Sequence, residues 1–405
     1  MKTIDTKKTK IAAIIVAVVL VFLFSSCSTY RNGFIKTLPE TMNSYSVNPD
    51  SIRQKKVELR TESAQIVSSL GSVKIREQAI PPALLNRLFG NLQAHYQIDS
   101  GYHRLLHSAK DDSLKTLARS RLIESAADYH QLFQHNKDLR RLINRGDQAF
   151  HVGRKTLLHS QKFLWAPANR ELLKQIVPDK LARHTKCCFL CRKCADNSNA
   201  AIYNTVGFFS ELFGRSVARI HEEPEPEKNV ARLMPYLQKW DIVLQKSPGR
   251  LTDRFIPGYF GHAAIYMGDS IFVESIQEGV INTGPFLFAE GGSFLIVRLT
   301  TISEEKGKRI RQLASCQTGK KYDFNFDVNS PDCLFCTELI YLVYEDIDWQ
   351  TRKSAGRITM SPDNIIQTVL DGDKFYFPLF FDEEQLIENP SPAFVESLLK
   401  REEAN

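Results

Sequence analysis

A short segment rich in proline and acidic residues divides the chain into two parts that differ in the spacing of their apolar residues. Residues 221–228 contain two prolines and four glutamates, a composition that disfavours regular structure and is typical of a linker. Apolar residues before this segment recur with a helical period, whereas those after it lie in short runs typical of β-strands. The sequence therefore predicts an α+β chain, with a helical domain over residues 56–220 and a mixed domain over residues 229–390.

The helical pattern is clearest between Gly101 and Gly146, where the intervening chain contains no Pro or Gly. Apolar side chains recur there close to every 3.6 residues, which predicts an amphipathic hairpin or bundle that ends at Gly146. Residues 169–176 and 200–213 predict further helices. The recurring apolar positions are Leu114, Leu117, Leu122, Ile123, Ala126, Tyr129, Phe133, Leu139, Leu142 and Ile143.

The N-terminus has the layout of an export signal. A lysine-rich stretch precedes an apolar core over residues 11–24, and two serines lead to Cys27. The whole resembles a bacterial lipoprotein signal over residues 1–26, although Phe24 stands where Leu is usual, and it implies cleavage before Cys27 and lipidation of its thiol. An uncleaved anchor is the alternative, but this core is shorter than the roughly 20 residues that span a bilayer. We expect a lipid-anchored protein of the bacterial cell envelope.

The charge balance argues against nucleic acid as a partner. Removal of residues 1–26 takes away four Lys and one Asp and lowers the formal charge from +7 to +4. This charge is modest and diffuse, which suits a surface near anionic lipid or wall polymer and is too weak to indicate nucleic-acid binding. Residues 27–55 are polar and turn-rich and predict a tether, and residues 391–405 predict a polar tail.

The mixed domain starts with strands and continues with helices. Two helices follow the strands, one from Ser303 to about Gln317 and one from about Phe335 to Tyr344, and Ser361 with Pro362 predicts the start of another. This order is typical of an α+β domain. Strands are predicted over residues 241–244, 263–267, 271–274 and 294–299.

His262 is the candidate base, because no other histidine follows His221. It stands at a predicted strand start directly after Gly261, where a side chain can be held rigidly. A structural histidine is the alternative interpretation. Its partner depends on the turn between the two strands that follow, around residues 268–270.

The register of this hairpin decides which residues lie beside His262. A two-residue turn would pair Met267 with Ser270 and place Glu274 on the face opposite His262. A three-residue turn would pair Met267 with Ile271 and Ile265 with Val273, and it would gather the apolar residues on one face. We predict the three-residue turn, which places Glu274 on the face of His262, where it can orient the imidazole.

Cys336 is the candidate nucleophile, because it precedes an apolar helical run. The unpaired N–H groups and the dipole at a helix N-terminus favour a thiolate and can receive an oxyanion. Cys333 is the rival nucleophile, and a structural disulfide between Cys333 and Cys336 is the alternative. Cys316 ends the preceding helix and is predicted to belong to the core.

Several fragments of the mixed domain, in this order, resemble the permuted papain-like, YiiX/YebB-like branch of the NlpC-type cysteine hydrolases. The likeness covers about residues 230–370, and it departs from the family at Trp240, where Gly is usual. The fragments are Gly261-His262-Ala263-Ala264-Ile265-Tyr266-Met267-Gly268-Asp269, Phe272-Val273-Glu274-Ser275, Lys321-Tyr322-Asp323-Phe324 and Cys336-Thr337-Glu338-Leu339-Ile340.

The resemblance implies a circularly permuted papain-like fold and a role for each matching residue. Cys336 would be the nucleophile, His262 the base and Glu274 the orienting group, while Tyr322 and Thr337 would contact the substrate or its oxyanion. The reaction would be acyl transfer through an acyl-enzyme, without metal or other cofactor.

A cluster of four cysteines lies in the helical domain, outside this resemblance. It consists of Cys187, Cys188, Cys191 and Cys194, with His184 nearby. Exported proteins are oxidised, which favours disulfides, while the CxxCxxC spacing also allows a metal site, and free or modified thiols are a third possibility.

Three functions are compatible with the sequence. The leading hypothesis is an envelope hydrolase that cuts an amide in a peptidoglycan peptide or a related small peptide. The second is a lipid acyltransferase or esterase similar to the lecithin:retinol acyltransferase-like enzymes, with residues 286–288 and the phenylalanines at 208 and 209 lining an acyl groove. The third is a scaffold lipoprotein whose site residues are present but misdirected.

Overall fold

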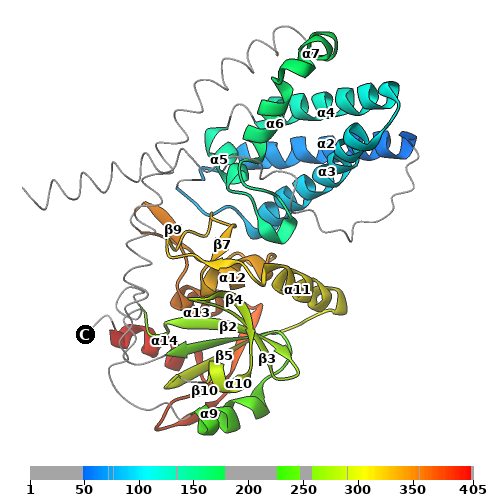
Figure 1. Cartoon of the computed structure of the whole chain (residues 1–405). Coiled ribbons are helices and arrows are strands. Elements are labelled where there is room, and N and C mark those ends of the chain that lie inside the picture. Colours follow the sequence, from blue (N-terminus) through cyan, green and yellow to red (C-terminus); the bar gives the residue numbers. More distant parts are fainter. Residues whose placement is uncertain are drawn as a thin grey trace, which may run out of the picture.

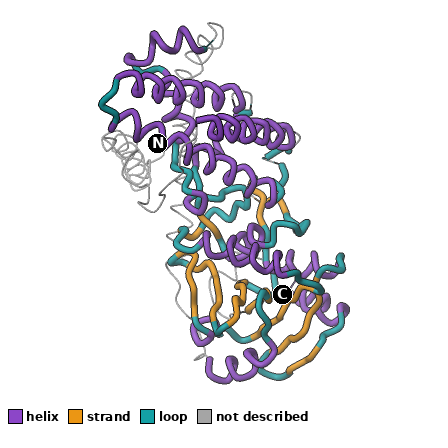
Figure 2. The backbone as a smooth tube through the Cα atoms, turned by 90° about the vertical axis from the view of Figure 1, so that its right-hand side faces the viewer, coloured by secondary structure: helices purple, strands orange, loops and turns teal. Residues whose placement is uncertain are grey.

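The computed structural model describes residues 49–402 apart from residues 72, 76, 134–135, 178–225, 247–257, 290 and 355. Figure 1 shows helices gathered in one half of the molecule and a curved sheet with its own helices in the other. Figure 2, turned by 90°, shows the same division, with the strands in orange confined to the lower half. The helical domain and the α+β domain predicted from the sequence are both present.

The helical domain is a bundle in which α3 packs between α2 and α4. Its buried apolar side chains include Leu88, Phe89 and Phe133. Its helices are α2 (Pro49–Gly71), α3 (Pro82–Ser108), α4 (Asp112–Phe133), α5 (Lys137–Arg145), η1 (Gln148–Phe150), α6 (Thr156–Leu164), η2 (Pro167–Asn169) and α7 (Arg170–Ile176).

Two helix caps divide the stretch that the sequence predicted as a helical hairpin or bundle. Asp111 Oδ1 accepts a hydrogen bond from Ser113 N at 2.8 Å at the start of α4. Asn136 caps α5 by accepting from Leu139 N at 2.9 Å. Each side chain satisfies a backbone N–H that the first helical turn leaves without a partner. Gly146 follows α5 with φ of 79° and ends it as predicted.

The α+β domain is built on one seven-stranded antiparallel sheet, in the order β11-β10-β5-β1-β2-β3-β4. Its strands are β1 (Asp241–Lys246), β2 (His262–Gly268), β3 (Ile271–Ile276), β4 (Gly279–Thr283), β5 (Ser293–Leu299), β10 (Phe375–Phe381) and β11 (Leu386–Glu388). Two small additional sheets pair β6 (Lys321–Tyr322) with β7 (Cys333–Leu334) and β8 (Arg352–Ser354) with β9 (Arg357–Thr359).

The central strands alternate between two apolar layers, as the period of two in a strand requires. Ile242 and Ile265 contribute to the larger core, whereas Val243 and Phe272 contribute to the second. The helices of this domain are α9 (Pro226–Leu233), η3 (Met234–Tyr236), α10 (Pro285–Phe288), α11 (Glu304–Gln317), α12 (Cys336–Val343), α13 (Pro362–Leu370) and α14 (Pro392–Glu402).

The structure corrects three boundaries predicted from the sequence. The predicted tether (residues 27–55) contains the start of α2, which Pro49 opens. The predicted linker (residues 221–228) contains the first turn of α9, where Pro226 and the acidic Glu227 suit the N-terminus of a helix. The predicted polar tail (residues 391–405) contains α14, whose buried Val395 and Leu398 join the core.

Trp240 has a backbone conformation that glycine adopts more easily than other residues. Its φ is 76°, in the left-handed region that favours glycine. Packing offsets this strain, since the indole lies against Gly307 and under the Arg311 guanidinium, 5.4 Å from the ring centroid. The Trp240 carbonyl also accepts a hydrogen bond from the Tyr344 hydroxyl at 2.7 Å.

The two domains share one continuous core. Leu85 and Phe89 of α3 belong to the same apolar cluster as Leu339 and Tyr341 of α12, and Figure 1 shows α12 at the edge of the sheet domain that faces the helical domain. Polar contacts reinforce this interface. The Tyr341 hydroxyl donates to the Ile80 carbonyl at 2.6 Å, and the domains are therefore held as one unit.

A buried ion pair crosses the same interface. Lys320 Nζ lies 2.7 Å from Asp147 Oδ1, and neither side chain is more than 2% exposed. Lys320 also donates to the Pro331 carbonyl at 2.5 Å. A second ion pair, between Arg154 and Asp332, joins the domains at 2.8 Å, but the Arg154 side chain is 75% exposed.

We expect Asp147→Ala to lower the free energy of unfolding by about 3–5 kcal/mol, because it leaves the Lys320 ammonium buried without its counter-ion. Arg154→Ala removes a solvent-screened pair across the same interface, and we expect it to cost less than about 1 kcal/mol. Urea denaturation of both variants measures the difference. Equal, small effects would contradict the role of the buried pair.

Candidate active site

The backbone that leads into His262 is fixed from two sides. Asp363, in the first turn of α13, accepts hydrogen bonds from Tyr259 N at 2.9 Å and Phe260 N at 3.3 Å. The Gly261 N–H donates to the Gln245 carbonyl of β1 at 3.1 Å. His262 is therefore the first residue of a strand whose entry is held rigidly, as a base requires.

The β2–β3 hairpin places Glu274 beside His262, as the predicted register requires. Ile265 pairs with Val273, and Ala264 pairs with Glu274. The turn itself differs from the prediction, because Asp269 and Ser270 form a two-residue turn with φ of 53° and 60°. An irregularity between Tyr266 and Gly268 takes up the extra residue, so that Gly268 rather than Met267 faces Ile271.

His262 and Glu274 form a buried, hydrogen-bonded pair. His262 Nε2 lies 2.6 Å from Glu274 Oε2, and the two side chains are 11% and 4% exposed. The second oxygen of Glu274, Oε1, accepts a hydrogen bond from the Thr283 hydroxyl at the end of β4. Thr283 could not be predicted from the sequence, because its contact with Glu274 depends on the pairing of β4 with β3.

Cys336 is the first residue of α12 and is buried. Its side chain lies close enough to His262 to help raise the pKa of the imidazole. The preceding Phe335 has extended backbone, and its N–H donates to Glu338 Oε2 at 3.4 Å. The sulfur therefore lies at a helix N-terminus, whose positive end favours an anion.

The rival cysteine has an environment unsuited to a nucleophile. Cys333 lies in β7, where burial and the neighbouring Asp323 and Asp332 carboxylates raise the pKa of its thiol far above the ordinary value. Cys333 and Cys336 are both free thiols, so the disulfide considered from the sequence is not formed. Cys316, in α11, is a partly buried free thiol.

The neighbours of His262 raise its pKa. Burial lowers the pKa, but the hydrogen bonds to Cys336 and Glu274 and the charges of these two groups outweigh it, and the pKa rises from 6.5 to about 9. The imidazole therefore carries two protons at neutral pH, facing Glu274 on one side and Cys336 on the other.

Tyr322 lies beside the candidate nucleophile. It belongs to β6, which pairs with β7 just before Cys336. Burial raises its pKa well above 10, and the charge of Cys336 contributes to the rise. The phenol stays protonated and can donate a hydrogen bond. Its ring packs against Phe324, with the centroids 4.9 Å apart.

The hydroxyl of Thr337, for which the sequence predicted a substrate or oxyanion contact, is engaged within the protein. It is buried and donates to the Met360 carbonyl at 2.6 Å, just before α13. The side chain therefore ties α12 to the chain entering α13, which is a structural role.

Two buried carboxyl groups lie in the neighbourhood of Cys336. Burial raises the pKa of Glu338 well above its usual range, and Asp323 and Asp327 add to the rise. Burial also raises the pKa of Asp323 to about 6, although its oxygens accept hydrogen bonds from Asn325 N and Asp327 N. Neither shift could be predicted from the sequence, since both depend on tertiary burial.

Neither a metal centre nor a membrane span is found among the described residues. Within these parts of the chain, no three His, Cys, Asp or Glu side chains are grouped to hold a metal ion. No helix there is long and apolar enough to cross a membrane. Cys27, the cysteine cluster at residues 187–194 and the predicted helix at residues 200–213 lie outside the described residues.

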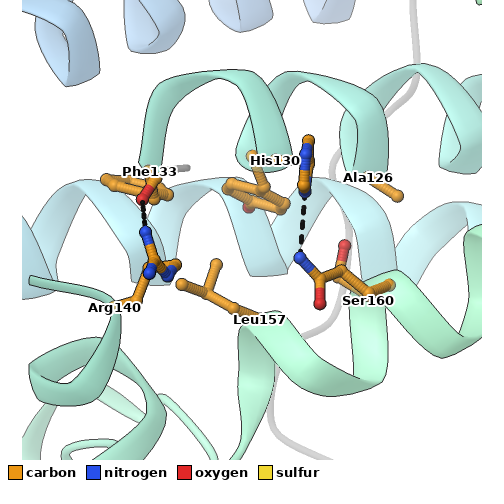
Figure 3. Close-up of a pocket in the computed structure, with 8 residues that line it drawn as sticks. Ala126, His130, Phe133, Arg140, Leu157 and Ser160 are labelled. Carbon is orange, nitrogen blue, oxygen red and sulfur yellow. Dashed lines mark hydrogen bonds between the residues drawn. The ribbon is translucent and has the colours of Figure 1, made fainter. Parts of the chain in front are cut away.

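A small cavity lies in the helical domain rather than at this site. Figure 3 shows it between α4, α5 and α6. His130 and Gln161 are joined there at 2.9 Å, and Arg140 donates to the Phe133 carbonyl at 3.1 Å. Its volume of about 10 Å³ suffices for about one water molecule, so it is too small for a substrate.

We expect nuclear magnetic resonance of the imidazole to show His262 titrating near pH 9. Folding raises the pKa of His262, so protonation of this residue stabilises the folded protein. This stabilisation is complete below pH 6.5 and is lost as the pH rises through about 9. Glu274→Gln keeps the shape of the side chain but removes its charge, and should lower this pKa. An unchanged value in that variant would contradict the pairing.

The comparisons with known proteins concern the same domain. Residues 236–387 match the family model described as permuted papain-like amidase enzyme, YaeF/YiiX, C92 family. The metalloprotein YiiX from Escherichia coli O157:H7 is a similar solved structure, with 19% identity and a TM-score of 0.30 over 39% of this chain and 99% of that chain. No curated protein sequence matches the chain. The α+β domain therefore resembles the permuted papain-like amidases over residues 236–387, and this match supports a cysteine hydrolase of the amidase class.

Proposed function

We propose that the protein hydrolyses an amide bond through Cys336, with His262 as general acid and base and Glu274 as the orienting group. The observation that carries this proposal is the line of hydrogen bonds from Cys336 through His262 to Glu274, placed at the N-terminus of α12. This geometry argues against a scaffold function, which would leave the same residues misdirected.

The proposed reaction proceeds in two halves. The Cys336 thiolate attacks the amide carbonyl carbon, and the resulting oxyanion receives hydrogen bonds from the backbone N–H at the start of α12 and from the Tyr322 phenol. The His262 imidazolium then gives its Nδ1 proton to the leaving amine, and a thioester to Cys336 remains. His262 next takes a proton from water, which attacks the thioester, releases the carboxylic acid and restores the Cys336 thiolate and the His262 imidazolium.

We propose a peptide of the bacterial cell wall, or a related small peptide, as the substrate class. The lipoprotein-like signal that ends at Cys27 would hold the protein at the cell envelope, where such amides are abundant.

A lipid ester is the second candidate substrate. The structure removes one of the aromatic residues that were predicted to line its acyl groove. The Phe288 ring is buried and stacks on Phe272 with centroids 4.5 Å apart, so it belongs to the core rather than to an acyl groove. Phe286 is 57% exposed and remains available to an acyl chain. Phe208 and Phe209 lie outside the described residues.

We expect Cys336→Ala to abolish amide hydrolysis, with a loss on the order of 10⁴-fold or more, because it removes the nucleophile. Wild type and variant are incubated with muropeptides and with phospholipid vesicles, and the products are identified by mass spectrometry. Cys333→Ala is the matched control and should keep its activity. Trapping of an acyl group on Cys336 would identify the substrate by mass, whereas activity that survives Cys336→Ala would overturn the mechanism.

We expect Cys27→Ser to abolish incorporation of radiolabelled palmitate and to move the protein from the membrane to the soluble fraction of a bacterial host. The reason is that the proposed anchor is attached to the Cys27 thiol. Cys316→Ser, at a cysteine within the folded part of the chain, is the control. Labelling that persists in Cys27→Ser would rule out lipidation at this residue.

A further inference from the structure

Thr283 donates a hydrogen bond to Glu274 and has no role in the reaction described above. Glu274 is buried, and its two oxygens have separate partners. Oε2 faces His262 Nε2, while Oε1 accepts from the Thr283 hydroxyl. An ionised carboxylate can only accept hydrogen bonds, so the hydroxyl is the donor.

The sheet brings Thr283 to this place. In the β3–β4 pair, Phe272 faces Thr283 and Glu274 faces Ile281. Thr283 and Glu274 are therefore diagonal neighbours on one face, a separation that side chains can bridge. Gly284 and α10 follow directly, and Phe288 of α10 packs on Phe272. Thr283 is only 6% exposed, so its hydroxyl has a fixed direction.

The physical need for this donor follows from burial. A carboxylate removed from water without hydrogen-bond donors is costly, and it reduces the cost by rotating or by taking a proton. Either change would weaken its interaction with His262. A hydrogen bond to Oε1 holds the plane of the carboxylate and favours its ionised form, so that Oε2 stays directed at Nε2.

We propose that Thr283 is a positioning residue of the hydrolase site, which holds Glu274 ionised and aligned on His262 through its hydroxyl. Thr283 would thus extend the line from Cys336 to a fourth residue without touching the substrate. This inference rests on the proposed function, because it assigns Thr283 a part in the same reaction.

Thr283→Val tests the proposal, because it replaces the hydroxyl by a methyl group of similar size. We expect kcat to fall by about 10- to 100-fold, the usual effect of removing a group that orients a functional side chain. Thr283→Ser keeps the hydroxyl and should retain activity within about threefold. Activity is measured on the amide whose cleavage depends on Cys336.

A second readout separates positioning from packing. Glu274 on β3 and Cys336 on α12 are the titratable groups that act on His262. A less stable Glu274 anion stabilises the imidazolium less, so the alkaline limb of kcat/KM and the resonance titration of His262 should both move to lower pH in Thr283→Val. In Thr283→Ser both should stay near the wild-type values.

Thr300→Val is the matched control, since it removes a hydroxyl that donates to the Asp373 carbonyl at 2.8 Å at the end of β5. We expect it to leave kcat and the pH profile unchanged. If Thr283→Val does not fold, Thr283→Ala makes the same comparison without the added methyl group. Equal losses in Thr283→Val and Thr283→Ser, or a loss without a shift of the alkaline limb, would overturn the proposal.

The experiments distinguish a failure of the Thr283 assignment from a failure of the proposed function. If Cys336→Ala remains active, the nucleophile is wrong and the proposed function fails. If Cys336→Ala is inactive while Thr283→Val has wild-type kcat and pH profile, only the assignment of Thr283 fails.

Discussion

The complete burial of α12 is the constraint on which the rest of the structure depends. All eight of its residues are buried, including Thr337 and Glu338. A helix that is apolar on every side must be covered on every side. The sheet covers it through β2 and β3, α11 packs beside it, and α3 of the helical domain completes the cover. The helical domain thus belongs to the structure that holds Cys336 in place.

The burial of α12 also affects the protonation of the ionisable groups near the Cys336 sulfur. Burial raises the pKa of Glu338 well above its usual range, and the charge of Lys320, which is paired with Asp147 across the domain interface, only partly opposes this rise. An ionised carboxylate in the first turn of α12 would repel an anionic sulfur two residues away. Burial lowers the pKa of His262, but its interactions with Cys336 and Glu274 outweigh burial and raise it. The ion pair at the interface and the chemistry of the site are therefore connected.

The sequence predicted those features of the site that depend on neighbours along the chain. The pairing of Ala264 with Glu274 follows from a local hairpin, and the place of Cys336 follows from the apolar run behind it. Contacts between distant segments could not be predicted, because a single sequence does not show which segments meet. Asp363 fixes the backbone before His262 from about a hundred residues away, and Thr283 depends on a strand that the pattern analysis passed over. The helices α9 and α14 were missed because their polar composition concealed a few buried residues.

The same arrangement limits how a substrate reaches the nucleophile. The C-terminal end of α12 is closed by the helical domain, where Asn86 donates to the Leu342 carbonyl at 3.1 Å and to Glu345 at 2.7 Å. The sides of α12 are closed by the sheet and by α11. The N-terminal end remains, where Cys336 meets His262 and where the partly buried rings of Tyr322 and Phe326 lie next to each other. The proposed acyl transfer would bring a carbonyl to this end of α12, where the first N–H groups of the helix lie beside Cys336.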